Sequence, residues 1–378
     1  MTTATATRRR KASGITLDRA TLFSALEAVG AAVPARSPKP ILSSVLLKDG
    51  MICGSDLEIQ VQTECEWTDD PVVLPYARLR SILKESAGDE VTLSVDGAAC
   101  TVKVGRGEWR LPVEDAAEFP TWEPADLKPV CRIPCDQFAR AIRSVVYAHD
   151  DESSRYALGA VLIEVRGSVC SVVATDGRRL ACATIEHDQA VDDIDVLLPA
   201  RAAAYIGRFA GEKGNAESAV QLEATRNECV ATIGGTTVTA RLLDGRFPRW
   251  RDVFPERPDA QVHTIAIDAL WHATRAAAIV TTEQSKGVDY AFTESGLTLS
   301  GRSAESGEST VVCEVAESGS PCVVKLDPWF VDQMCKALLT LEGEPHVRVS
   351  VAGKGDAVIF TYGEDDEYRS VIMPLAHD

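Results

Sequence analysis

The sequence lacks a segment that could cross a membrane as a helix. Such a helix needs about 20 consecutive apolar residues, and no apolar run approaches that length in the 378 residues. The first residues also lack the charged and then apolar pattern of a secretory leader, so we expect none. With 45% hydrophobic and 25% charged residues, the composition predicts a soluble globular protein with well-buried cores.

The cysteines show no pattern of disulfides or of a metal site. Their number is odd, 11. Several lie inside strand-like runs: Cys53, Cys100, Cys170, Cys229 and Cys313. We interpret them as small buried side chains in a reducing compartment. Cys131 and Cys135 lack a second pair or a His-x-x-x-His that would complete a zinc site, so we expect no metal and no other cofactor.

No complete catalytic or nucleotide-binding motif is present. A Gly-x-x-x-x-Gly-Lys-Ser/Thr loop is missing, and Gly353-Lys354-Gly355 is typical of a hairpin turn. Ser81 and Lys84 match the spacing of penicillin-binding-type hydrolases without the companion motifs of that class. One helix face explains that spacing as well, so a hydrolase is an alternative and we predict that the protein is not an enzyme. The acidic run 364–367 is interpreted as a solvated loop, with metal binding as the alternative.

The most informative pattern is a repeat of about sixty residues that occurs six times. Each repeat begins with a strand pattern, then has Pro or Asp, and continues with apolar residues at helical spacing. The six starts are Ile15-Thr16-Leu17-Asp18, Val73-Leu74-Pro75, Ile133-Pro134, Leu197-Leu198-Pro199, Ile265-Ala266-Ile267-Asp268 and Lys325-Leu326-Asp327-Pro328. They predict helices over 18–31, 76–86, 135–147, 200–211, 268–280 and 327–339. A unit used repeatedly indicates a symmetric scaffold.

A coarser repeat joins these units in pairs. Phe119-Pro120-Thr121-Trp122 returns as Phe247-Pro248-Arg249-Trp250, and Met373-Pro374 follows about one period later. This predicts three homologous domains, each of two half-repeats, over 14–126, 127–257 and 258–378, with linkers near 124–130 and 255–260. Residues 1–13, which include Arg8-Arg9-Arg10-Lys11, are expected to be a disordered basic tail, with a nucleic-acid-binding arm as the alternative.

Short β-branched runs fill the sequence between the predicted helices. They include 45–47, 91–95, 100–104, 161–165, 169–173, 230–233, 238–240, 297–299, 347–349 and 358–360. Turn signals separate them, among them Asp96-Gly97, Arg166-Gly167, Gly234-Gly235 and Ser295-Gly296. One helix followed by several antiparallel strands predicts an α+β fold in which helices cover one face of continuous sheets.

The charge is distributed unevenly. The net charge is −17, which by itself disfavours a nucleic-acid ligand. However, the predicted helices carry more basic than acidic residues, and several of the acids stand at helix starts, where they cap the helix. If the helices share one face, that face is basic and the remaining surface is acidic. Exposed helix faces that simply carry Arg and Lys explain the same pattern.

Residues 174–181, Ala-Thr-Asp-Gly-Arg-Arg-Leu-Ala, combine a strand end, a tight turn, two arginines and a leucine. This predicts an apolar pocket with a cationic rim, or an ordinary hairpin. The motif resembles the signature of the bacterial DNA polymerase III beta subunit family, the sliding clamps. Five further segments carry the resemblance, which covers residues 14–376: Arg36 to Leu42, Gly54 to Glu58, Arg155-Tyr156, Leu243 to Pro248 and Val371 to Leu375.

The resemblance implies a head-to-tail homodimer of three-domain subunits that closes into a ring around duplex DNA, with helices lining the hole. The implied function is processivity: the ring tethers the replicative polymerase to DNA without sequence preference. The implied partners are double-stranded DNA, the polymerase catalytic subunit, a clamp loader, and other polymerases and repair proteins that carry short linear motifs of the Gln-Leu-x-Leu-Phe kind. The implied location is the cytoplasm, at the nucleoid. A clamp-like paralogue that acts as a soluble adaptor is the alternative.

The resemblance also implies three sets of site residues. The DNA-binding set is Arg36, Arg78, Arg80, Lys84, Arg140, Arg143, Tyr156, Arg201, Arg208, Arg275 and Lys336. The partner-peptide pocket is Arg155, Leu158, Thr175, Gly177, Arg178, Arg179, Leu180, Pro248, Val253, Phe330, Val371, Met373, Pro374 and Leu375. The dimer interface is Arg106, Trp109, Leu111, Ile279, Val280, Glu305 and Glu308.

This sequence departs from the family pattern at several of these positions. Ala157 replaces a second tyrosine, and the preceding loop 149–152 is acidic. Arg178 stands where the family has histidine. Glu108 adds a charge to the expected interface, and the end Leu375-Ala376-His377-Asp378 lacks a terminal Arg-Leu. We expect the change at Arg178 to be tolerated, and the others to affect DNA contact, pairing and partner selectivity.

Overall fold

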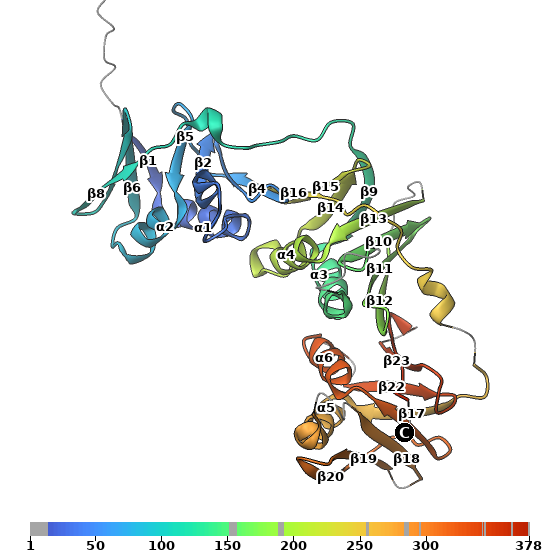
Figure 1. Cartoon of the computed structure of the whole chain (residues 1–378). Helices are drawn as coiled ribbons and strands as arrows, with labels where there is room; N and C mark the ends of the chain where they lie inside the picture. Colours follow the sequence, from blue (N-terminus) through green and yellow to red (C-terminus); the bar gives the residue numbers. More distant parts are fainter. Residues whose placement is uncertain are drawn as a thin grey trace, which may run out of the picture. The chain divides into compact units, whose positions relative to one another are not determined.

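The computed structural model describes residues 14–150, 157–187, 193–254, 257–282, 287–294, 296–341, 343, 345–363 and 366–376 (Figure 1). The chain forms two compact units. Unit 1 comprises Met1–Asp126 and Val230–Arg241, and unit 2 comprises Leu127–Cys229 and Leu242–Asp378. The predicted tail 1–13 lies outside the described residues. Among the residues that are described, no helix is long and apolar enough to cross a membrane.

All six predicted helices are present in the described chain, each shorter than predicted by up to a few residues. They are α1 (Arg19–Val29), α2 (Tyr76–Glu85), α3 (Cys135–Val145), α4 (Ala200–Ala210), α5 (Ile267–Ala277) and α6 (Pro328–Leu338). Short 3-10 helices are η1 (Gly30–Ala32), η2 (Pro40–Ser43), η3 (Ala116–Glu118), η4 (Val146–Ala148), η5 (Lys213–Asn215), η6 (Trp250–Val253) and η7 (Ala278–Val280). Since η1, η4 and η7 directly continue α1, α3 and α5, they account for part of the difference.

The residues before the helices explain where the helices begin. Asp18 accepts a hydrogen bond from the Thr21 amide at 2.7 Å, and Asp327 caps α6 in the same way through the Trp329 amide at 3.0 Å. Capping of this kind satisfies an amide that has no partner inside the helix. Pro75, Pro134 and Pro199 stand immediately before α2, α3 and α4, each with a backbone conformation outside the helical region.

Unit 1 contains a four-stranded antiparallel sheet in the order β1-β6-β7-β8. These strands are β1 (Ile15–Asp18), β6 (Glu90–Asp96), β7 (Ala99–Val104) and β8 (Gly107–Pro112). A second set runs β5-β2-β3-β4-β16, comprising β5 (Val72–Pro75), β2 (Ser44–Lys48), β3 (Met51–Ser55), β4 (Ile59–Glu64) and β16 (Thr236–Arg241). The helices α1 and α2 pack against these strands, and Leu22, Leu26 and Leu79 are fully buried between the layers.

Unit 2 contains an eight-stranded sheet in the order β13-β10-β11-β12-β24-β23-β22-β17. Its strands are β13 (Ile194–Pro199), β10 (Ala160–Arg166), β11 (Val169–Thr175), β12 (Arg179–Glu186), β24 (Tyr368–Ile372), β23 (Val358–Tyr362), β22 (His346–Val351) and β17 (Gln261–Ala266). Strands β12 and β24 pair with Leu180 opposite Val371, which joins the second and third predicted domains in one sheet. The domain boundaries themselves stay a prediction.

The remaining strands belong to unit 2 or carry the chain from unit 2 to unit 1. A four-stranded sheet runs β20-β19-β18-β21, with β20 (Gly307–Cys313), β19 (Gly296–Ser303), β18 (Val288–Thr293) and β21 (Cys322–Leu326). Strand β9 (Lys128–Pro134) pairs with β14 (Ala219–Ala224), and the chain passes from unit 2 to unit 1 within β15 (Glu228–Ile233). Because β9 begins at Lys128, the linker predicted to reach residue 130 ends earlier.

All the strand runs predicted from β-branched residues lie inside observed strands. The predicted turn glycines Gly97, Gly167 and Gly234 each have a positive φ, between +56° and +61°, which glycine adopts without steric penalty. The eleven cysteines are free, and only Cys322 is incompletely buried, which confirms their interpretation as buried thiols. Burial raises the pKa of the Cys53 thiol to about 12, so that thiol is protonated at neutral pH.

His263 is a fully buried titratable group on β17. Its ring stacks on Phe292 with centroids 4.1 Å apart, and Nδ1 accepts a hydrogen bond from the Gly319 amide at 3.2 Å. Nε2 lies 3.5 Å from Cys322 Sγ. Because Nδ1 is an acceptor, the ring is neutral in the folded protein, and burial lowers the pKa of His263.

We predict that His263 makes unit 2 less stable in mild acid. The unfolded state keeps an ordinary histidine pKa and binds a proton that the folded state excludes, so stability present above that pKa is lost as pH falls. The unfolding temperature of the wild type should fall more between pH 7.5 and 5.5 than that of His263→Asn, which retains an acceptor for Gly319. His272→Asn, at an exposed position, is the control. Parallel pH profiles for wild type and His263→Asn would contradict this role.

Candidate functional site

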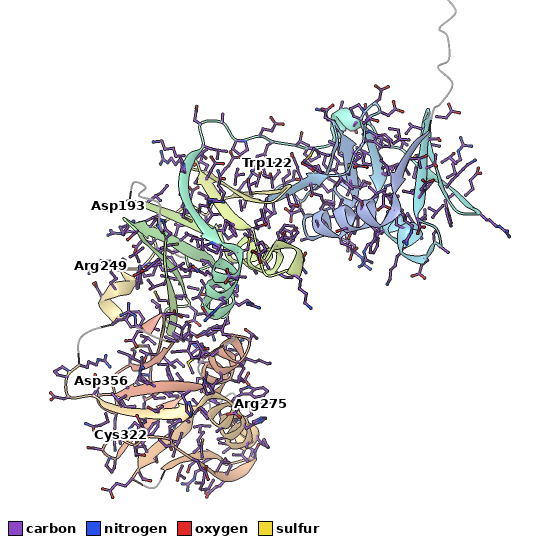
Figure 2. The ribbon with its side chains drawn as sticks, turned by 180° about the vertical axis from the view of Figure 1, so that it is seen from behind. Trp122, Asp193, Arg249, Arg275, Cys322 and Asp356 are labelled. Carbon is purple, nitrogen blue, oxygen red and sulfur yellow. The ribbon has the colours of Figure 1, made fainter. Side chains whose placement is uncertain are left out.

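Four helices of unit 2 bury one side on the sheets and leave cations on the other. Phe138, Ile142 and Val145 of α3 are buried, whereas Arg143 is exposed and Arg140 is half-buried. The other exposed cations are Arg201 and Arg208 on α4, Arg275 on α5 and Lys336 on α6. Figure 2 shows Arg275 on the helical side of the unit, opposite Asp356 on the strand side. The helices thus present basic side chains away from the core.

Weak contacts hold some of these cations without burying them. Arg140 lies 3.9 Å from Glu367, and Arg275 lies 3.8 Å from Asp332. The Arg275 guanidinium also stands over the Trp271 ring, 4.9 Å from its centroid. Exposed ion pairs of this kind contribute little to stability, so the charges stay accessible to an external anion.

Unit 1 carries its predicted cations on α2 and on the loop before η2. Arg78 and Lys84 are exposed on α2, and Arg36 is exposed on the loop. Arg80 differs, because it pairs with Glu27 of α1, and this hydrogen bond lowers the pKa of Glu27. Arg19, the basic residue that begins α1, directs its donors into the protein, to the Leu83 and Gly88 carbonyls. Tyr156 lies outside the described residues.

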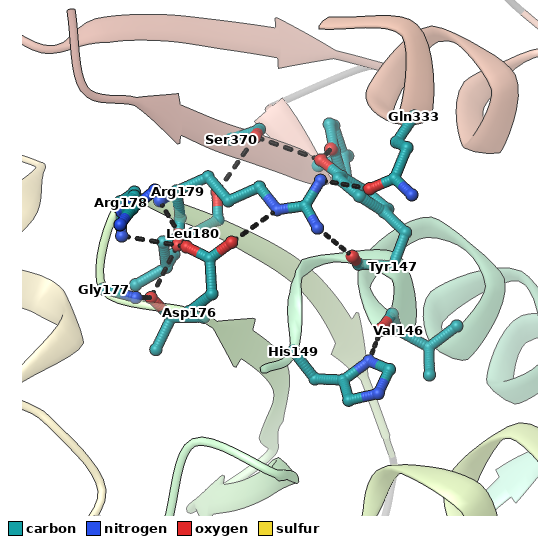
Figure 3. A network of polar contacts seen from close by, with 12 residues as sticks. Val146, Tyr147, His149, Asp176, Gly177, Arg178, Arg179, Leu180, Gln333 and Ser370 are labelled. Atoms are coloured by element: carbon teal, nitrogen blue, oxygen red, sulfur yellow. Dashed lines mark hydrogen bonds and ion pairs between the residues drawn. The ribbon is translucent and has the colours of Figure 1, made fainter. Parts of the chain in front are cut away.

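The turn between β11 and β12 is built by its own side chains (Figure 3). Asp176 Oδ1 accepts from the amides of Arg178 and Arg179 at 2.8 and 2.9 Å. Thr175 Oγ1 accepts from the Gly177 amide at 3.1 Å and donates to the Arg179 carbonyl at 2.6 Å. Gly177 has φ +85°, a conformation that favours glycine. The turn therefore presents Gly177 and Arg178 to solvent in a fixed conformation.

An apolar cluster lies beside this turn, on one side of the eight-stranded sheet. Its buried members include Leu180 and Val371, together with Leu162, Val173, Cys182, Trp250 and Ala357. Phe247, Phe254, Leu197 and Ile359 pack against it. Pro248, Val253 and Met373 are exposed, and each lies within two residues of a member of this cluster in the sequence. The cluster thus places apolar side chains beside the exposed polar groups of the turn, which is the combination that ligand sites use for affinity and orientation.

The C-terminal segment is held next to the turn by backbone hydrogen bonds. The Met373 amide donates to the Arg178 carbonyl at 2.9 Å, and the Leu375 amide donates to the Lys325 carbonyl at 2.8 Å. Pro374 and Leu375 are half-buried, as is Leu158. Predicted pocket residues that are far apart in the sequence thus come together. They lie on the turn between β11 and β12, on η6 and on the C-terminal segment. Arg155 lies outside the described residues.

Arg179 corrects one part of the prediction. We expected its donors to be available to a peptide, but its side chain is only 3% exposed and all three of its nitrogens have partners. Thr175 and Phe330 are buried as well. These three buried residues therefore lie beneath the predicted peptide surface and are not exposed on it. Of the two arginines on this turn, Arg178 is the exposed one and can meet a ligand.

Sequence reasoning missed the residues that hold the segment carrying Pro248 and Val253. Buried Glu164 on β10 pairs with Arg251, whose guanidinium stands 4.2 Å over the Trp250 ring. Arg369 stands 4.6 Å over the Phe254 ring in the same way. The repeat of Phe-Pro-x-Trp was the available signal, because its tryptophan becomes the core residue. The arginine contacts depend on strand pairing that no local pattern reveals.

The predicted interface residues lie at the edges of the two four-stranded sheets. In unit 1 they surround edge strand β8, where Trp109 is 36% exposed and Leu111 is buried, with Arg106 on the preceding turn. In unit 2 they surround edge strand β20 and η7, where Ile279 is 79% exposed.

Charged residues flank both edges. Glu308 pairs with Arg302 at 3.0 Å, and Glu108 pairs with Lys103 at 3.0 Å, so the charge of Glu108 is balanced within its own subunit. Glu305 is exposed and Val280 is half-buried. Val312, 73% exposed on β20, extends the apolar edge and was not predicted.

The hydrolase alternative gains no support from the geometry. Ser81 Oγ donates to the Ala77 carbonyl one helical turn earlier, at 2.9 Å, and Lys84 lies exposed on the same helix. A nucleophile needs a base that accepts its proton, and Ser81 instead directs that proton into the helix backbone. Within the described parts of the chain, no group of three or more His, Cys, Asp or Glu residues is arranged to hold a metal ion. Glu364 and Asp365 of the acidic run lie outside those parts, whereas Asp366 pairs with Arg348.

Comparison with known proteins covers nearly the whole chain. Residues 14–123 match the family described as DNA polymerase III beta subunit, N-terminal domain, and residues 132–249 match its central domain; together they make up more than half of the chain. The beta sliding clamp of Salmonella typhimurium is 26% identical over 369 residues, covering 95% of this chain and 99% of that protein. The beta sliding clamp of Pseudomonas putida is 26% identical over 370 residues, with the same coverage.

Solved structures show the same fold. The sliding clamp of Pseudomonas aeruginosa superposes with a TM-score of 0.87 at 24% identity, over 96% of this chain and 100% of that chain. The sliding clamp of Bacillus subtilis superposes with a TM-score of 0.86 at 21% identity, over 97% and 100% of the two chains.

Proposed function

The chain belongs to the family of the DNA polymerase III beta subunit and is a sliding clamp, and we propose that two copies close head to tail around duplex DNA. It is not an enzyme: it gives processivity by tethering the replicative polymerase. The same ring would carry a clamp loader, other polymerases and repair proteins, all bound through short linear motifs. We place it in the cytoplasm, at the nucleoid where its DNA is.

The observation that carries the DNA proposal is the position of the cations. The chain has a net charge of −17, yet five of the six helices present arginine or lysine on the side opposite their buried face. A ring holds DNA topologically, so it needs only weak attraction to phosphates without contact to base edges. A moderate number of exposed, loosely paired cations supports sliding, whereas an acidic exterior disfavours DNA elsewhere.

The proposed subunit contact joins two different surfaces. Trp109 of β8 would meet Ile279 and Val280 beside β20 of the partner, with Arg106, Glu305 and Glu308 at the edge. An interface between unlike surfaces forms a closed ring when its rotation closes after a fixed number of copies. The exposed apolar residues at both edges support this pairing, because large apolar side chains at 36% and 79% exposure gain most from being covered.

The proposed partner surface is the apolar cluster beside the Thr175–Arg179 turn. Met373 is an adaptable wall, Pro248 and Pro374 are rigid walls, and exposed Arg178 offers donors to peptide carbonyls or acids. A leucine or phenylalanine of a linear motif would pack on Val253 and Met373. Since all partners would use this one surface, they should compete with one another.

The first prediction tests the helix cations. Arg201→Glu with Arg208→Glu should shorten the lifetime of the loaded ring on nicked circular DNA, because attraction to two phosphates becomes repulsion. The slope of log affinity against log salt should fall by about 0.9 for each phosphate that the protein no longer neutralises. Lys128→Glu with Arg226→Glu, the same charge change at exposed positions outside the helices, is the control. If both double variants shorten the lifetime equally, the effect comes from the net charge of the protein and not from the helix cations.

The second prediction tests the subunit contact. Ile279→Asp should weaken dimerisation about 30-fold or more, because a charge replaces a central apolar contact. Sedimentation velocity across a concentration series gives the dissociation constant, and Trp109→Ala should shift it in the same direction. Val262→Asp, at an exposed apolar residue of β17, is the matched control. Dimers of unchanged stability in both Ile279→Asp and Trp109→Ala would show that the contact lies elsewhere.

The third prediction tests the partner surface. Deletion of residues 373–378 should abolish binding of a Gln-Leu-x-Leu-Phe peptide, measured by fluorescence anisotropy, and should leave the dimer intact. Met373→Ala alone should weaken binding about tenfold, as expected when one anchor is truncated. A peptide with both leucines and the phenylalanine replaced by alanine is the control. If the truncated protein binds the peptide as tightly as the full chain, the partner surface is misassigned.

A further inference from the structure

Arg179 is a buried cation whose three nitrogens reach three different elements of unit 2 (Figure 3). Nε donates to Asp176 Oδ2 at 3.0 Å, on the turn between β11 and β12. Nη2 donates to the Tyr147 carbonyl at 2.6 Å, in η4 at the end of α3. Nη1 donates to Gln333 Oε1 on α6. A guanidinium offers these donors in one rigid plane, so the three acceptors must keep a fixed arrangement.

Aromatic rings enclose the same guanidinium. Its central carbon lies 5.1 Å from the centroid of Tyr147, 4.8 Å from that of Trp329 and 4.7 Å from that of Phe330. Each distance is within the range of a cation–π interaction, which strengthens where water is excluded. Trp329 is nevertheless 54% exposed, so one side of this enclosure reaches solvent.

The elements that Arg179 connects belong to different predicted domains. The turn and η4 come from residues 127–257, whereas α6 comes from residues 258–378. The two parts also meet where β12 pairs with β24, and where the Tyr147 hydroxyl bonds to the Tyr368 hydroxyl at 2.7 Å and to Ser370 Oγ at 3.2 Å. Burial raises the pKa of Tyr147, so its hydroxyl stays protonated and can donate in this cluster.

The turn that Arg179 holds on one side forms the edge of the proposed partner surface on the other. Asp176 Oδ2 binds the guanidinium, while its Oδ1 holds the amides of Arg178 and Arg179. The Arg178 carbonyl in turn accepts from the Met373 amide. The Asp176 carboxylate therefore links Arg179, which reaches α6, to the turn, and through the turn to the segment that carries Met373.

From this geometry we propose that Arg179 is a positioning residue that couples the partner surface to the joint between the second and third domains. It does not contact the peptide. It sets the position of Gly177, Arg178 and Met373 according to where α6 stands, so movement at the joint changes peptide affinity. By linkage, a bound peptide must then stabilise the arrangement of α6 that favours it. This inference rests on the proposed peptide-binding function.

The test compares Arg179→Lys with Gln333→Leu, because Gln333 lies on α6 and outside the predicted pocket. Arg179→Lys keeps the charge and removes the planar set of donors. It should weaken binding of the Gln-Leu-x-Leu-Phe peptide about tenfold, a typical size for coupling between sites. Gln333→Leu should weaken it by a smaller factor, and the double variant should bind no worse than Arg179→Lys alone, since Gln333 acts through Arg179. Arg178→Gln, on the same turn, tests the direct contact of an exposed arginine with the peptide, whereas Arg179→Lys tests positioning.

Trp329 supplies a second readout. If Arg179 only stabilised the fold, its replacement would not change how Trp329 responds to the peptide. Peptide binding should alter the indole emission, taken as the difference between each protein and its Trp329→Phe counterpart, and this change should vanish in Arg179→Lys. If Arg179→Lys fails to fold, Gln333→Leu carries the test with the same emission measurement.

Two results would overturn the inference while leaving the partner surface in place: wild-type peptide affinity in Gln333→Leu, or additive decreases of affinity in the double variant. A wild-type protein that does not bind the peptide would instead remove the proposed function.

Discussion

Each helix of this chain buries one side on antiparallel strands, and the rest of the structure depends on that packing. Burial of Leu22 and Leu26 in α1 or of Phe138 and Ile142 in α3 stabilises the layers by roughly 1.5–3 kcal/mol per side chain. It also fixes which side of each helix stays free. The exposed cations of α2 to α6 follow from it, because the same helical period that buries one stripe exposes the opposite one. Acidic residues elsewhere account for the negative total.

Much of this arrangement could be predicted from local pattern. The six helices and the strand runs have periods and turn residues that act over a few positions, so Asp18, Pro134 or Gly234 indicates its element directly. Strands such as β3, β12 and β20 were not anticipated in full, because their residues mix polar and apolar side chains and become strands through pairing with neighbours. The exposed edge residue Val312 was missed for the same reason.

The site was harder to predict in detail than the fold. The turn 175–179 could be located from its residue types, but the role of each arginine depends on burial, which the sequence does not encode locally. Arg178 and Arg179 are adjacent, and one is exposed while the other is enclosed by Tyr147, Trp329 and Phe330, residues that come from two distant segments. The anchoring of Arg251 by Glu164 is likewise a contact between distant segments. Such contacts between distant segments hold the proposed partner surface from the buried side.

The central claim is that the protein holds DNA by enclosing it. The most direct measurement is to load the protein with its clamp loader onto a nicked circular plasmid, isolate the complex, and then cut the plasmid once with a restriction enzyme. We predict that the protein stays on the circle and leaves promptly after the cut, because a ring slides off a free end. Equal retention on circular and linear DNA would contradict enclosure and would indicate binding by surface contact alone.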